Sequence, residues 1–155
     1  MAATRQAKAI WTGDLAKGSG EVSALSSKQF DGLPVSWAAR TEAPEGKTSP
    51  EELLAAAHAS CFAMALSARL AKNGTPPQRL EVTANVRFDK VQDAWAVVAS
   101  ELGLDAIVPG ADEETFTKLV EDAKDNCPIS KALEGNVALS VTAKLHQRSE
   151  ARASS

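Results

Sequence analysis

The residues of this chain best suited to redox chemistry are its two cysteines, Cys61 and Cys127. Cys61 lies in the run "HASCFAMALS", three residues after His58. On a helix these two side chains share a face, so an imidazolium could lower the pKa of the thiol and favour the nucleophilic thiolate. The same pair can also be a small buried thiol and a hydrogen-bonded core histidine. For His58 we expect the core role.

Cys127 stands in "DNCPISKAL", directly before a proline that suits the first position of a helix. Cys127 or Asn126 is therefore the expected N-cap, where a thiolate would feel the positive end of the helix dipole. In a reducing compartment, two cysteines far apart are either independent buried thiols or a pair that closes transiently. Their spacing excludes a CxxC motif and a cysteine-based zinc cluster, so we expect no metal and no cofactor.

A carboxylate and a cation lie upstream of Cys61. Glu52 fits a capping box with Ser49, whereas Glu51 is roughly 80° from Cys61 on a helical wheel. Ten residues of helix separate the Cα atoms of Glu51 and Cys61 by about 15 Å, which excludes direct contact. An arginine between them could bond both groups, and Arg40, expected at the end of the preceding strand, is the best candidate. The alternatives are that Arg40 is an ordinary surface arginine and that Glu51 interacts favourably only with the helix dipole.

Periodicity and turn residues predict the elements that must position these groups. The longest is a helix of about 24 residues, with Ser49 as N-cap, Pro50 at its first position and Gly74 after its end. The expected strands are residues 4–13, 18–25, 33–40, 79–89, 95–108 and 136–145, and the other expected helices are residues 111–126 and 127–135. The order βββ-α-ββ-α-α-β predicts an α+β fold with a mostly antiparallel sheet and a long central helix.

Composition narrows the functional classes. The 155 residues, 44% of them apolar, predict one domain over residues 1–145, with residues 146–155 as a solvated tail. A net charge of −3 without a basic stripe argues against nucleic acid as a partner. The N-terminus lacks an apolar signal region, and the longest nearly uncharged run is about 14 residues, too short to cross a bilayer. We therefore expect a cytoplasmic protein without a membrane partner.

The long helix also carries small residues on all sides, which suits close contact with a sheet and with a second subunit. The motif "SPEELLAAAHASCFAMALS", followed much later by "CPISKAL", resembles the osmotically inducible protein C (OsmC) branch of the OsmC/Ohr family of thiol peroxidases. The resemblance covers residues 8–145 and includes a "GxG" at residues 18–20, "AARTE", "FDKV" and "VPG".

The resemblance implies a cysteine-based peroxidase that reduces organic hydroperoxides, and hydrogen peroxide less well, in oxidative or osmotic stress defence. It gives Cys61 the peroxidatic position and Cys127 the resolving one, with an intramolecular disulfide between them. It also implies that Arg40 and Glu51 polarise the peroxide and keep Cys61 as thiolate. Family members are intertwined homodimers with sites at the subunit interface. A dithiol must reset such an enzyme, and a lipoylated protein is expected before thioredoxin.

One departure concerns the branch of the family. The branch specialised for organic hydroperoxides has "AxGYAACF"-like and "CPYS"-like motifs and an earlier arginine, whereas this chain has "AAAHASCF" and Arg40. We therefore expect a broader preference among alkyl hydroperoxides. An ordinary peroxiredoxin would need threonine where His58 stands. The alternatives kept open are a non-enzymatic, stress-associated protein that binds small molecules and a Cys-His hydrolase.

Overall fold

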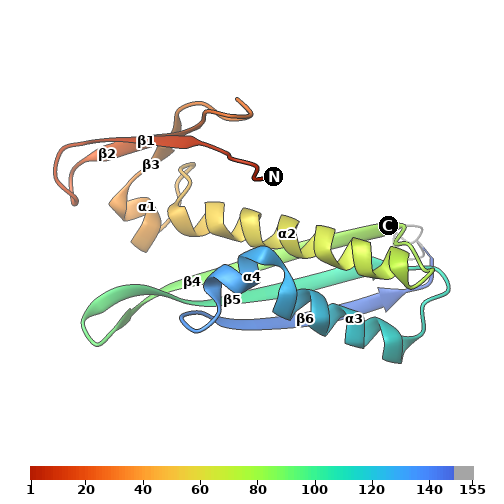
Figure 1. The fold of residues 1–155 in the computed structure, drawn as a ribbon. Helices are drawn as coiled ribbons and strands as arrows, with labels where there is room; N and C mark the ends of the chain where they lie inside the picture. Colours follow the sequence, from red (N-terminus) through yellow and green to blue (C-terminus); the bar gives the residue numbers. More distant parts are fainter. Residues whose placement is uncertain (149–155) are drawn as a thin grey trace. The chain divides into compact units, whose positions relative to one another are not determined.

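The structure, a computed structural model, describes residues 1–148. Contacts between Cα atoms divide the chain into two compact units, residues 1–53 and residues 54–155. Each unit has its own three-stranded sheet. The helices lie between groups of strands in the chain, which makes this an α+β fold (Figure 1). The predicted fold class is thus confirmed.

The N-terminal unit is built on a small antiparallel sheet in the order β1-β2-β3. Its strands are β1 (Ala7–Thr12), β2 (Ser19–Ala24) and β3 (Leu33–Val35). Gly20 pairs with Trp11 on one side and Val35 on the other. A Cβ atom at Gly20 would lie 2.6 Å from Trp11 Cε3, so this position requires a residue without a side chain.

The expected third strand, residues 33–40, is wrong in its second half. Only Leu33–Val35 is a strand, and a short helix, α1 (Trp37–Thr41), follows it. Ser36 is the N-cap, because its Oγ accepts a hydrogen bond from the Ala39 N–H at 3.1 Å. Arg40 therefore lies in the last turn of a helix and not at the end of a strand.

The long predicted helix is confirmed as α2 (Pro50–Lys72). Ser49 Oγ accepts from the Glu52 N–H at 3.1 Å, and Gly74 follows the end of the helix with φ +83°. Length and apolar composition alone would also let α2 cross a membrane, as they would for the core helix of many soluble proteins. Two rows of side chains four residues apart differ in exposure: His58, Phe62, Leu66 and Leu70 are buried, whereas Ala56, Ser60, Met64 and Ala68 are exposed.

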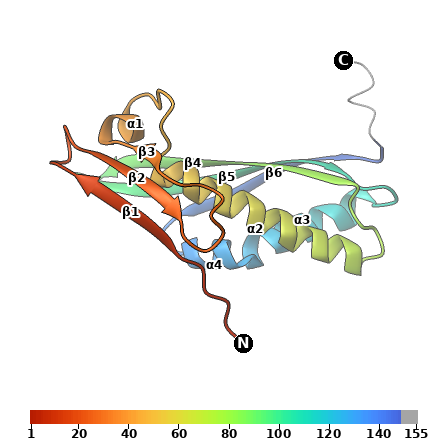
Figure 2. The same cartoon turned by 90° about the horizontal axis from the view of Figure 1, so that it is seen from above.

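The C-terminal unit has a second sheet in the order β4-β5-β6. Its elements are β4 (Arg79–Val91), β5 (Ala94–Ile107), α3 (Glu113–Asn126), α4 (Pro128–Leu133) and β6 (Ala138–His146). The β4–β5 hairpin is antiparallel as expected, whereas β6 runs parallel to β5. The helices lie over this sheet, and the core includes Phe62, Leu66, Leu102, Leu104, Phe116 and Val120 (Figure 2).

The end of the last strand lies slightly beyond its predicted bound. His146 belongs to β6, and the Gln147 side chain accepts from the Gly110 N–H at 3.0 Å and donates to the Ala111 carbonyl at 2.8 Å. The predicted tail therefore begins later than residue 146, and residues 149–155 lie outside the described part of the chain. The prediction of one domain over residues 1–145 stays a prediction.

Candidate active site

The two cysteines, far apart in the sequence, meet in the C-terminal unit. Cys61 lies in α2 and is partly exposed, whereas Cys127 is completely buried. Both are free thiols, and Cys127 lies close enough to Cys61 to raise the pKa of the Cys61 thiol. Of the two expected caps, Cys127 is the N-cap of α4, and its Sγ accepts from the Ser130 N–H at 3.4 Å. The contact can therefore become a disulfide between an accessible and an inaccessible thiol.

The pKa of the Cys61 thiol is raised above its ordinary value, first by burial. A hydrogen bond from the Ile129 backbone N–H acts in the opposite direction, while the hydrogen bond and charge of Cys127 raise the pKa further. The contacts around Cys61 thus favour the neutral thiol. Because the thiolate is the nucleophile, a reactive Cys61 needs an additional positive charge to hold its ionised form.

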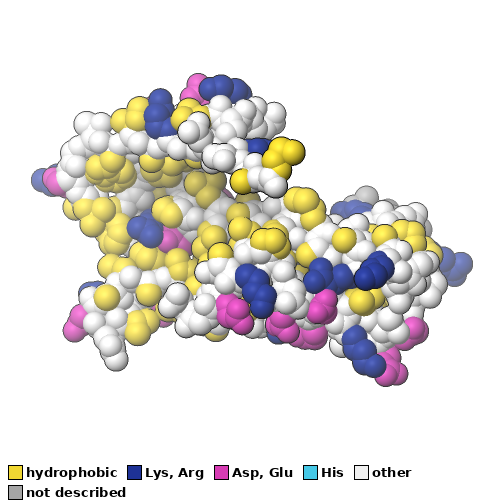
Figure 3. Space-filling view, in the orientation of Figure 1, with side chains coloured by type: hydrophobic (Ala, Val, Ile, Leu, Met, Phe, Trp, Pro, Cys, Tyr) yellow, Lys and Arg dark blue, Asp and Glu magenta, His cyan; other side chains and the backbone are white. Residues whose placement is uncertain are grey.

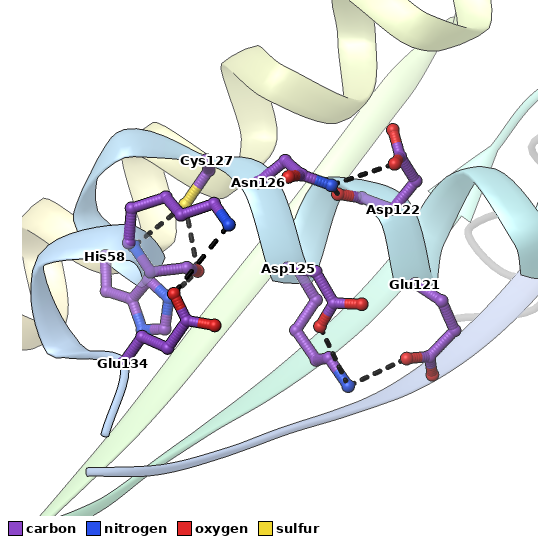
Figure 4. Close-up of polar contacts among 10 residues, drawn as sticks. His58, Glu121, Asp122, Asp125, Asn126, Cys127 and Glu134 are labelled. Atoms are coloured by element: carbon purple, nitrogen blue, oxygen red, sulfur yellow. Dashed lines mark hydrogen bonds and ion pairs between the residues drawn. The ribbon is translucent and has the colours of Figure 1, made fainter. Parts of the chain in front are cut away.

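His58 is linked to Cys127 by hydrogen bonds. Its Nδ1 is 2.6 Å from Ser100 Oγ, and its Nε2 is 2.9 Å from Ser130 Oγ. Ser130 Oγ is in turn 3.1 Å from Cys127 Sγ. Figure 4 shows the imidazole and the sulfur close together where α4 begins. The buried cluster of Ser100, His58, Ser130 and Cys127 is called the serine–histidine cluster below.

Burial lowers the pKa of His58, so its imidazole is neutral at physiological pH. The prediction of a hydrogen-bonded core histidine is confirmed. Both ring nitrogens have serine partners, so the imidazole is not arranged as a base directed at Cys61, which a Cys-His hydrolase needs. Ser100 and Ser130 were not predicted as members of the site. Ser130 carried a local signal, since it stands three residues after the cap Cys127, whereas Ser100 comes from a distant strand.

Arg40 and Glu51 form an ion pair within the N-terminal unit. Arg40 Nε lies 3.0 and 3.1 Å from the two carboxylate oxygens of Glu51, and Arg40 Nη2 lies 2.8 Å from Oε1. Glu51 is only 8% exposed, and the guanidinium carbon of Arg40 is 5.9 Å from the centre of the Trp37 ring. The predicted cation and carboxylate are thus brought together, with the planar guanidinium in a fixed orientation.

An apolar cleft of about 430 Å³ adjoins Arg40 in the same unit. Its lining includes Trp11, Val22, Val35, Trp37, Arg40 and Leu53. Hydrophobic side chains gather on the N-terminal unit in the space-filling view (Figure 3). A cleft of this kind can hold an alkyl chain while the guanidinium binds a polar oxygen. Within residues 1–148, His, Cys, Asp and Glu side chains form no group of three or more that could hold a metal ion.

The model of the OsmC-like protein family matches residues 43–142, which is more than half of the chain. The chain belongs to the OsmC-like protein family. This OsmC-like protein is 38% identical to the peroxiredoxin OsmC of Escherichia coli over 139 residues, which cover 90% of the chain and 96% of the relative. It is 36% identical to organic hydroperoxide resistance protein-like 1 of Staphylococcus epidermidis over 103 residues, 65% of the chain and 73% of the relative.

The fold of this OsmC-like protein is similar to that of the organic hydroperoxide resistance protein OhrB of Bacillus subtilis. The TM-score is 0.71 at 25% identity, and the match covers 90% of the chain and 98% of OhrB. Glu51, Cys61 and Cys127 lie within the segment that the family model matches, whereas Arg40 precedes it. The matched segment of this chain therefore includes both cysteines and the carboxylate that pairs with Arg40.

Proposed function

We propose that this OsmC-like protein is a thiol peroxidase that reduces organic hydroperoxides to alcohols, and hydrogen peroxide less well, in oxidative or osmotic stress defence. The observation that carries the proposal is the contact between the partly exposed Cys61 and the buried Cys127. Relatives named peroxiredoxin and organic hydroperoxide resistance protein support the same chemistry.

The proposed reaction has two steps. The Cys61 thiolate attacks the outer oxygen of the hydroperoxide, the O–O bond breaks, and the alkoxide leaves and takes a proton to become an alcohol. Cys61 is then a sulfenic acid. Cys127 attacks its sulfur, an S–S bond forms, and the S–O bond breaks to release water. A dithiol, such as a lipoyl group on a protein, returns the disulfide to two thiols.

Arg40 and Glu51 have electrostatic roles in this proposal. The guanidinium stabilises the Cys61 thiolate and the negative charge that develops on the peroxide, and the carboxylate fixes the orientation of the guanidinium. The raised pKa of Cys61 is the reason that such a cation is needed. The apolar cleft beside Arg40 suits the alkyl part of an organic hydroperoxide better than it suits hydrogen peroxide.

The proposal includes a homodimer in the cytoplasm. The support for the homodimer is the exposed row on α2, where Ala56, Ser60 and Ala68 leave room for a close approach and Met64 is 68% exposed. Small side chains beside one exposed large apolar side chain suit a helix face that is covered by a second subunit.

Intact-mass measurement after one equivalent of an alkyl hydroperoxide tests the function. The parent should lose two hydrogens as the Cys61–Cys127 disulfide forms, Cys127→Ser should gain one oxygen, and Cys61→Ser should not change. The alcohol product should appear in equal amount with the oxidised parent. Peroxide consumption by Cys61→Ser at the parent rate would contradict the mechanism, and an acyl-enzyme mass with an activated ester would favour the hydrolase.

A further inference from the structure

The resolving thiol lies where bulk water cannot reach it. Cys127, Ser130, His58 and Ser100 all have an exposed fraction of 0%. Attack by Cys127 on another sulfur requires its thiolate, so the S–H proton must go to a group inside the protein. The hydrogen bond between Cys127 Sγ and Ser130 Oγ is the start of such a route, and it leads to His58 Nε2.

We propose that Ser130 and His58 form a proton relay that activates Cys127 for disulfide formation. Ser130 contacts the reacting sulfur, and His58 is a positioning residue that acts through the Ser130 hydroxyl. The inference rests on the proposed peroxidase function for its biological step and adds a role for two residues that the proposed reaction leaves unused.

The hydrogen bonds permit two arrangements that differ in the imidazole tautomer, and the proposed relay starts from one of them. His58 Nδ1–H donates to Ser100 Oγ, which leaves a lone pair on Nε2. Ser130 Oγ–H donates to that lone pair, and the Cys127 S–H donates to Ser130 Oγ. In this arrangement Ser100 accepts from Nδ1–H, and Nε2 is the acceptor that the relay requires. The lowered pKa of His58 agrees with this neutral starting state.

The step balances in protons and electrons. As the Cys127 sulfur attacks the Cys61 sulfenic acid, its S–H bond breaks and the proton passes to Ser130 Oγ, whose own proton passes to His58 Nε2. The sulfur electron pair forms the S–S bond, and the pair of the S–O bond leaves with hydroxide. Hydroxide takes a proton to become water, and the imidazolium returns its proton to solvent. The net change is loss of one water from a thiol and a sulfenic acid.

The product side of the transfer is also hydrogen-bonded. With a proton on each ring nitrogen, the imidazolium donates to both serines, and the Ser130 hydroxyl turns to donate to the thiolate of Cys127. No buried donor or acceptor of the serine–histidine cluster loses its partner in either state. A network that satisfies both protonation states has a low reorganisation cost for the transfer.

The sharpest test uses a reaction that needs no peroxide. With dithiobis(nitrobenzoate), the accessible Cys61 releases a first coloured thiolate and becomes a mixed disulfide. Cys127 then attacks the Cys61 sulfur and releases a second one. Stopped-flow absorbance separates the two releases, and Cys127→Ser should give only the first.

His58→Gln keeps a hydrogen-bonding side chain that cannot hold the proton, and Ser130→Ala removes the link to Cys127. In both variants we expect the second release to slow by about 100-fold at neutral pH while the first release keeps the parent rate. Ser130→Thr retains the hydroxyl and should restore the second release. Thr117→Ala is the matched control, because its exposed hydroxyl bonds the Glu113 carbonyl of its own helix, α3.

The pH profile distinguishes a relay from a structural role. In His58→Gln, the second release should recover as rising pH supplies hydroxide in place of the missing imidazole base, which repacking damage would not do. Cys127 before α4 is the titratable group that Ser130 links to the imidazole, and Ser100 on β5 brings no charge. Lys131 and Glu134 of α4 pair with each other at 3.7 Å on the surface.

A second release at the parent rate in His58→Gln would overturn the relay, as would equal slowing of both releases without recovery at high pH. If Ser130→Ala fails to fold, the His58→Gln result still decides. A different result would overturn the peroxidase proposal alone. An alkyl hydroperoxide would then oxidise neither cysteine of the parent, while the two coloured releases would still respond to the variants as expected.

Discussion

The two units of the chain hold their polar groups in opposite ways. In the N-terminal unit, Arg40 and Glu51 carry full charges, and the Arg40 side chain remains 29% exposed. In the C-terminal unit, the serine–histidine cluster has no exposed member and carries no net charge, because burial lowers the pKa of His58. One unit thus offers a cation with access to solvent, and the other offers a neutral base without it.

The difference follows from the cost of burying charge. Glu51 can be ionised at 8% exposure because the guanidinium gives it bonds to both oxygens, and that guanidinium keeps part of its hydration. His58 has only neutral serine partners, so a buried imidazolium would be poorly compensated. Under the proposed function, the charged pair acts on developing negative charge at the peroxide, and the neutral cluster acts on a proton during resolution.

The largest expected effect comes from removing the cation. Arg40→Met should slow oxidation of Cys61 by an alkyl hydroperoxide by about 100-fold, because the thiolate and the transition state lose their positive charge. The same change leaves the buried Glu51 carboxylate without its bidentate partner, which should lower the free energy of unfolding by about 2 kcal/mol. Single-turnover mass analysis gives the rate, and denaturant unfolding gives the stability.

Arg40→Lys is the matched control, since it keeps the charge and loses the planar fork. It should retain more of the peroxide reaction than Arg40→Met does. The second release in the aromatic disulfide assay should be unchanged in both variants, because resolution belongs to the serine–histidine cluster. If Arg40→Met reacted with the peroxide at the parent rate, the proposed role of Arg40 in the reaction would be contradicted.

Local sequence signals predicted much of the fold and part of the site. Ser49 and Gly74 mark the ends of α2, and Cys127 is the cap of α4, because capping needs only residues a few positions apart. The same kind of signal was misread at Ser36. That cap starts a five-residue helix, α1, which is too short to show helical periodicity.

Long-range partners were harder to predict. Ser100 bonds to His58 from a strand 42 residues away, and nothing in the local pattern of β5 marks its hydroxyl as a partner. The parallel pairing of β6 with β5 likewise depends on the path of the helices α3 and α4 between them. Resemblance to a family supplied the pairing of Cys61 with Cys127, which spacing alone left open.

A packing prediction compares the two sheets. Gly20→Ala would place a Cβ 2.6 Å from Trp11 Cε3 and should lower the free energy of unfolding by about 2 kcal/mol. Gly103→Ala in β5 is the control, because its Cβ would meet only the Thr83 carbonyl oxygen at 3.9 Å. We expect Gly103→Ala to be neutral or slightly stabilising. Denaturant unfolding followed by circular dichroism measures both, and equal losses would contradict the close packing at Gly20.

Acid stability tests whether the serine–histidine cluster is neutral. The folded-state pKa of His58 lies below its unfolded value, so below about pH 6.5 the unfolded chain binds the proton more strongly. The free energy of unfolding should therefore fall as pH decreases through this range, by up to about 1.4 kcal/mol per pH unit from this group. His58→Gln should lack this contribution. Equal pH dependence in parent and variant would show that His58 is charged or exposed.

The smallest expected effect is a shift in the ionisation of Cys61. In the parent, its pKa lies above the ordinary range for cysteine, mainly through burial, and Cys127 raises it further. Cys127→Ala removes that hydrogen bond and charge, so the pKa of Cys61 should decrease while burial still holds it high. The rate of Cys61 alkylation by iodoacetamide under reducing conditions, followed by mass across pH, should therefore rise at lower pH in Cys127→Ala than in the parent.

Arg40→Met should shift the same profile to higher pH if the cation of the N-terminal unit acts on the thiolate. Coincident profiles in all three proteins would mean that neither unit tunes Cys61 through charge, and that burial alone sets its reactivity.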